Sequence, residues 1–86
     1  MNNQSGKSDK AVVRRLVSDI REFSAEINNH ADKMMQETDD LNIYWDDPQY
    51  KAFREYMEGI INDLERATSV LNEAANTVEQ RELKEI

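Results

Sequence analysis

The sequence predicts an all-α fold: an antiparallel two-helix hairpin that dimerises into a four-helix bundle. Three observations lead to this prediction. Two long stripes of apolar residues follow helical spacing, and a short interruption at residues 43–48 separates them. The apolar face is also wider than contact with a single neighbouring helix requires.

The first helix is expected over about residues 9–40. It follows a polar segment, residues 1–8, which we expect to be a flexible tail. Ser8 or Asp9 can accept hydrogen bonds from the first free backbone amides and so start the helix. Steps of three and four keep side chains on one helical face. The residues that follow this rule are Val13, Leu16, Ile20, Phe23, Ile27, His30 and Met34.

The second helix is expected over about residues 48–81, after a turn at about 41–47. Asp46 or Asp47 can cap it, and Pro48 suits the first helical position because its missing N–H is not needed there. Its apolar stripe is Tyr50, Phe53, Met57, Ile60, Leu64, Ala67, Leu71, Ala74 and Val78. A connection of about seven residues favours antiparallel neighbours. The hairpin therefore spans about residues 9–82, and residues 83–86 form a short C-terminal tail.

Dimerisation is expected because further apolar residues widen the stripe, namely Val12, Val17, Met35, Tyr56, Ile61 and Val70. A face this wide is covered economically when two hairpins form a four-helix bundle, with a two-fold axis if they are identical. We expect the partner to be a second copy or a related helical hairpin. The predicted intersubunit core is Leu16, Ile20, Phe23, Ile27, Phe53, Met57, Ile60 and Leu64.

Composition excludes several classes of function. A net charge of −7 argues against nucleic-acid binding, which needs a concentrated basic face. The chain has no cysteine, and its apolar runs are too short to span a membrane. The first residues lack the apolar core of a classical signal peptide. We therefore expect synthesis in the cytoplasm and secretion by a route that needs no classical signal.

Catalytic and metal-binding patterns are weak. Asp40, Asn42, Tyr44 and Asp46 imitate the start of a calcium loop, but Trp45 stands where that loop needs glycine and Lys51 where it needs glutamate. No Ser/His/Asp group or carboxylate pair with a plausible pocket emerges, so we expect neither enzymatic activity nor a cofactor. His30, the only histidine, has two open interpretations: an ordinary half-buried residue at the bundle edge, or a group that titrates near neutral pH.

Trp45 lies at the hairpin turn next to Tyr44, where neither aromatic residue is needed for turn geometry. One interpretation is a plug that closes the end of the bundle. The other is an anchor for a second protein, because Trp and Tyr bury a large area and carry a polar handle. The sequence leaves both open.

The arrangement resembles the WXG family, small helical-hairpin substrates of type VII secretion. The matching residues are Trp45-Asp46-Asp47, then Phe53 eight residues later, and the stripe Ile60, Leu64, Leu71 and Val78, so that the resemblance covers about residues 10–80. It implies that Trp45 belongs to a recognition surface completed by a partner's tail. Asp47, which we assign to the same recognition surface, occupies the place of the family's glycine. The family's tail signal, Tyr-x-x-x-Asp/Glu, is replaced by Val78 and Glu82 at similar spacing.

Two functions are therefore expected. The first is a WXG-like secreted protein, or the secretion partner of one, with a secretion ATPase or a larger toxin as a further partner. The alternative is a cytoplasmic chaperone or adaptor that pairs with the helical N-terminal region of a larger toxin or effector.

Overall fold

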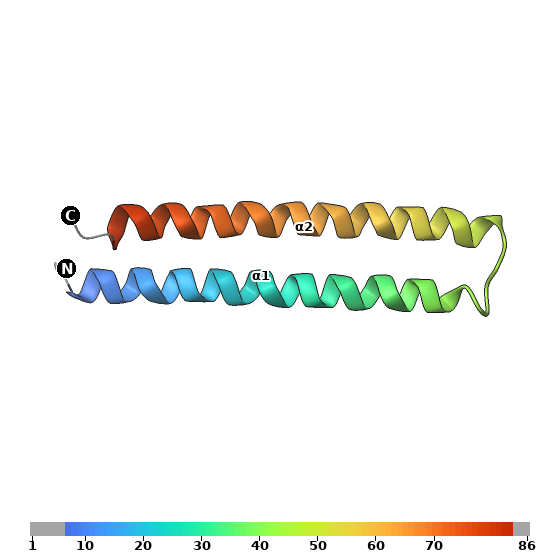
Figure 1. Cartoon of the computed structure of the whole chain (residues 1–86), viewed down its shortest axis with the longest axis horizontal. Helices are drawn as coiled ribbons and strands as arrows, with labels where there is room; N and C mark the ends of the chain where they lie inside the picture. The colour runs from blue at the N-terminus through green and yellow to red at the C-terminus, as the bar shows by residue number, and fades with distance from the viewer. Residues whose placement is uncertain (1–6, 84–86) are drawn as a thin grey trace.

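The computed structural model describes residues 7–83 as two long helices that run side by side in opposite directions (Figure 1). Helix α1 spans Lys7–Leu41 and helix α2 spans Pro48–Glu82, each of 35 residues. The hairpin predicted from the sequence is confirmed, although α1 begins two residues earlier than expected. Most of the two predicted tails, residues 1–6 and 84–86, lies outside the described residues.

The molecule is a rod. It measures 61 × 22 × 16 Å and has a Cα radius of gyration of 19.3 Å. A compact chain of the same length has a radius of gyration of about 12 Å. The two helices therefore pack against each other along their length without folding back into a globule.

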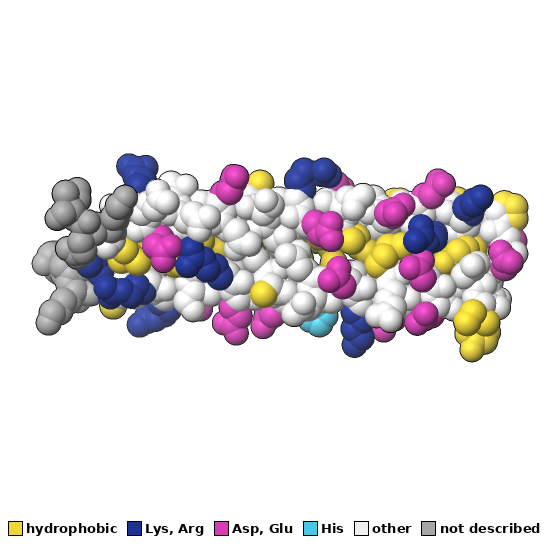
Figure 2. Space-filling model, viewed as in Figure 1, with side chains coloured by type: hydrophobic (Ala, Val, Ile, Leu, Met, Phe, Trp, Pro, Cys, Tyr) yellow, Lys and Arg dark blue, Asp and Glu magenta, His cyan; other side chains and the backbone are white. Residues whose placement is uncertain are grey.

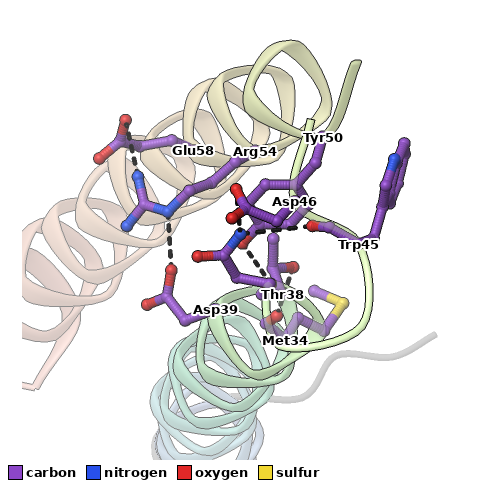
Figure 3. A network of polar contacts seen from close by, with 9 residues as sticks. Met34, Thr38, Asp39, Trp45, Asp46, Tyr50, Arg54 and Glu58 are labelled. Carbon is purple, nitrogen blue, oxygen red and sulfur yellow. Dashed lines mark hydrogen bonds and ion pairs between the residues drawn. The ribbon is translucent and has the colours of Figure 1, made fainter. Parts of the chain in front are cut away.

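The start of α2 is fixed by the cap that the sequence predicts. Of the two candidates, Asp47 is the capping residue, and its side chain accepts a hydrogen bond of 3.0 Å from the Tyr50 backbone N–H. The Tyr50 hydroxyl in turn donates a buried hydrogen bond of 2.7 Å to the Thr38 carbonyl oxygen. The bond from the Tyr50 hydroxyl ties the first turn of α2 to the last turns of α1 (Figure 3).

Small and polar side chains fill the contact between the helices. The buried positions recur every seven residues, as Val17, Ser24, Ala31 and Thr38 on α1 and as Ile61, Thr68 and Ala75 on α2. Ala31 and Ala75 are 0% exposed. Small residues at a helix contact let the two backbones approach closely. We call these positions the small-residue seam.

Most polar side chains of this seam have a hydrogen-bond partner close to them. The Thr38 hydroxyl donates to the Met34 carbonyl oxygen at 2.8 Å, as a threonine in a helix commonly does. The Thr68 hydroxyl lies 2.9 Å from the Glu65 carbonyl oxygen and 3.0 Å from the Asn28 amide oxygen of the other helix. The Ser24 hydroxyl is buried and has no hydrogen-bond partner among the described residues.

Ion pairs cross the seam on one side. Arg21 of α1 bonds Glu79 at 2.9 Å and Asn76 at 2.7 Å, and Arg54 of α2 bonds Asp39 at 2.7 Å. The hydrogen bond from Arg21 lowers the pKa of Glu79, so the contribution of this pair is complete above the ordinary glutamate pKa and is lost as the pH falls below it. Because all these groups are exposed, the pairs fix register more than they stabilise the fold.

Figure 2 shows one face of the molecule, on which acidic and basic side chains are spread along both helices. On this face the apolar side chains gather mainly in the line between the helices. The ion pairs and the spread of charge make this side of the hairpin one that water can solvate.

The small-residue seam predicts that position 31 tolerates only a small side chain. We expect Ala31→Leu to destabilise the hairpin by about 1–3 kcal/mol, because a larger side chain forces apart helices that touch through small residues. Ala25→Leu is the matched control, since Ala25 is exposed on the same helix. Urea denaturation at one protein concentration measures both, and equal stability of the two variants would contradict the seam.

Candidate interaction surface

The large apolar side chains of this chain lie outside the small-residue seam. Leu16 is 50% exposed and Phe23 is 52% exposed, although both are typical core residues. The other predicted dimer-core residues, Ile20, Ile27, Phe53, Met57, Ile60 and Leu64, are half-buried. The single hairpin therefore buries six of the predicted intersubunit core residues in part and leaves Leu16 and Phe23 exposed.

Both helices contribute to the same apolar surface. Met34 and Leu41 of α1 line a shallow groove of about 290 Å³ together with Phe53 and Met57 of α2. The helical repeat continues this surface along both helices. We define the open apolar face as Val13, Leu16, Ile20, Phe23, Ile27, Met34, Leu41, Phe53, Met57, Ile60, Leu64, Leu71 and Val78.

The exposed area measures how incomplete the core is. The hairpin has an accessible surface of 6680 Å² for a mass of 10.1 kDa. A compact monomer of this mass exposes roughly 5,300 Å², so the whole chain, which forms an elongated rod, exposes roughly 1,400 Å² more. Among residues 10–83, whose side chains the structure describes, five apolar residues are buried, namely Val17, Ala31, Tyr50, Ile61 and Ala75.

Trp45 packs against the aromatic residues at the start of α2. Its ring meets Tyr50 edge-on at a centroid distance of 5.6 Å and lies tilted over Phe53 at 5.7 Å. The side chain is half-buried. Figure 3 shows the ring on the other side of the turn from the ion pairs of Arg54. The two residues on which the family resemblance depends, Trp45 and Phe53, therefore touch each other beside the open apolar face.

The structure also gives the positions of Asp47 and His30. Asp47 is exposed and its carboxylate is engaged in capping α2, so its structural role is assigned while its role in recognition stays a prediction. His30 is exposed on α1. A second groove, of about 610 Å³, lies at the turn and is lined by Asn42, Asp46, Asp47, Pro48, Tyr50, Lys51 and Arg54.

Sequence reasoning missed the innermost contact. Five residues of this contact are buried but do not belong to the predicted apolar stripes: Ser24, Ala31, Thr38, Thr68 and Ala75. Their signal was present in the strict seven-residue spacing with Val17 and Ile61. The high exposure of Ile43 and Tyr44, 80% and 86%, was also not anticipated.

Among the described side chains of residues 10–83, no three His, Asp or Glu are grouped so that they could hold a metal ion. Neither α1 nor α2, within the described residues 7–83, has an apolar stretch long enough to cross a bilayer.

Comparison with known proteins returned no relatives: the chain matches no protein-family model, no curated protein and no solved structure. Its function therefore has to be argued from its own surface.

The Tyr50 hydroxyl predicts a measurable contribution to stability. We expect Tyr50→Phe to lower the free energy of unfolding by about 1–2 kcal/mol, because it leaves the buried Thr38 carbonyl oxygen without that donor. Tyr56→Phe is the matched control, since Tyr56 is 68% exposed. Urea denaturation distinguishes the two, and an equal loss in both variants would show that the Tyr50–Thr38 bond does not secure the end of the hairpin.

Proposed function

We propose that this chain is a non-enzymatic, WXG-like helical-hairpin protein that acts as a dimeric four-helix bundle and is secreted, or escorts a secreted partner, through a type VII system. The observation that carries the proposal is the open apolar face, which runs along both helices and is left uncovered by the hairpin. An apolar face that is exposed to water favours association with another protein, and the proposed function provides that association.

The free energy of folding favours a state in which another chain covers the open apolar face. Full burial of a large apolar side chain contributes about 1.5–3 kcal/mol, and folding must offset about 1–2 kcal/mol of backbone entropy for every ordered residue. Among the described residues the hairpin fully buries five apolar residues, two of them alanines, and most of its large apolar side chains stay partly exposed. A second hairpin placed on the open apolar face supplies the missing burial.

A second copy is the simplest occupant. Two-fold symmetry lets the same patch of each subunit meet its counterpart, which requires an elongated patch that fits itself. The two helices have equal length, and each carries large apolar residues along the same face.

The link to secretion is supported at the turn. Trp45 precedes the cap of α2 and contacts Phe53, so the residues that resemble the family motif form one local unit. In the proposal, Trp45 and the neighbouring Asp47 belong to the surface that the secretion machinery recognises. A secretion ATPase or a larger toxin is the further partner.

Dimerisation through the open apolar face is tested at Phe23. We expect the natural chain to have twice the 10.1 kDa chain mass in solution. Phe23→Glu should weaken the dimer about a hundredfold or more, because it places a carboxylate in an apolar contact. Ala25→Glu, at an exposed position of the same helix, is the control and should leave the mass unchanged. Sedimentation equilibrium measures all three, and a monomeric natural chain would exclude the homodimer.

The role of Trp45 is tested by separating export from assembly. We expect Trp45→Ala to keep the dimeric mass and helix content but to reduce the amount of protein exported. Tyr56→Ala, which removes an exposed aromatic residue of α2, should be exported normally. Immunoblots of the medium and the cells give both amounts. If Trp45→Ala unfolds the protein and shows no separate export defect, the residue is a plug of the bundle.

A chaperone or adaptor is the second candidate, favoured by one observation. Val78 stands where the family's tail signal has an aromatic residue, so the export signal would have to come from another chain. Under this alternative the open apolar face binds the helical N-terminal region of a larger toxin. Purification in a one-to-one complex with such a protein, together with a monomeric mass of the isolated chain, would decide for it.

A further inference from the structure

The tip of the hairpin carries an exposed apolar pair that the fold does not need. Ile43 and Tyr44 are 80% and 86% exposed, the highest values among the large apolar residues that the structure describes. The turn is closed without them, by backbone hydrogen bonds such as Trp45 N–H to the Leu41 carbonyl oxygen at 3.0 Å and by the Asn42 side chain to the Trp45 carbonyl oxygen at 3.3 Å. Turns are ordinarily built from small and polar residues.

The open apolar face does not include this pair. Both residues follow the end of α1 at Leu41 and lie in the turn, at the opposite end of the rod from the start of α1 and the end of α2 (Figure 1). The exposure of Ile43 and Tyr44 therefore needs an explanation separate from the open apolar face.

The surroundings of the pair are acidic. Residues 37–47 contain five Asp and Glu and no Lys or Arg. Asp39 is paired with Arg54 and Asp47 caps α2. Glu37 and Asp40 make no ion pair within the described residues, and with Leu41 and Tyr44 they line a shallow groove of about 270 Å³.

This groove suits an arginine side chain. Its aliphatic stem can lie on Leu41, its guanidinium can stack on the Tyr44 ring, and its N–H groups can donate to the two carboxylates. An anionic membrane surface is repelled by the same carboxylates. A tip-to-tip contact between two copies is also disfavoured, because it brings two acidic tips together.

We propose that the hairpin tip is a docking surface for a different protein, which inserts an arginine between Glu37, Asp40 and Tyr44 and covers Ile43 with apolar side chains. The arginine supplies charge complementarity, and the apolar contact around Ile43 and Tyr44 supplies buried area. The docking surface goes beyond the proposed function, since it is centred on Ile43 and Tyr44, which lie outside the open apolar face. Glu37 and Leu41 line the tip groove and also the groove between the helices.

The test begins with a photo-crosslinking amino acid, p-benzoylphenylalanine, in place of Tyr44 in cells that make the protein. The same amino acid in place of Tyr56 is the matched control, because Tyr56 is also an exposed tyrosine but lies on α2 away from the tip. We expect one protein to be crosslinked from position 44 and not from position 56. Crosslinks only to a second copy of this chain, crosslinks only to lipid, or no crosslink at all would each overturn the proposal.

The captured protein is then purified and its binding to the intact chain is measured by calorimetry. We expect Tyr44→Ala and Asp40→Lys each to raise the dissociation constant about tenfold or more, and Tyr56→Ala to leave it unchanged. Added salt should weaken binding of the natural chain. Undiminished binding by Tyr44→Ala or by Asp40→Lys would overturn the proposal. Sedimentation of Tyr44→Ala reports on dimerisation independently, so that failure of the tip and failure of the dimer are distinguishable.

Discussion

The close contact of α1 and α2 through small side chains is the constraint on which the rest of the structure depends. Ala31 and Ala75 are fully buried, and Ser24 and Thr68 lie beside them in the same seven-residue repeat. Phe23 precedes the seam residue Ser24 by one position, so the helical repeat places it to one side of the seam. The seam thereby gives the hairpin two unlike sides, one with ion pairs and one with large apolar residues.

This division gives the two sides of the hairpin different chemical character. The ion pairs of Arg21 and Arg54 hold the register of the hairpin on its solvated side. The opposite side carries partly exposed apolar side chains, and the turn, closed by Asp47 and Tyr50, presents aromatic and acidic side chains at one end. The proposals accordingly assign assembly and recognition to different parts of one rod.

Much of the fold could be predicted from the sequence, because helical periodicity, Asp47 and Pro48 determine where each helix lies and where α2 begins. The seam escaped prediction because Ser24, Ala31 and Thr68 are not apolar core residues by type, and burial of small residues depends on how closely two backbones approach. The exposure of Ile43 and Tyr44 depends on the path of the turn, which residue pattern alone does not specify.

The most direct test of this account is whether folding of the natural chain depends on its own concentration. A protein that must cover its open apolar face with a second copy is stabilised by mass action, so its midpoint of thermal unfolding rises with protein concentration. Far-ultraviolet circular dichroism across the micromolar range measures this midpoint. We predict a clear rise with each tenfold increase in concentration. A midpoint that stays constant, with full helix content at the lowest concentration, would contradict the account, because the hairpin would then fold alone.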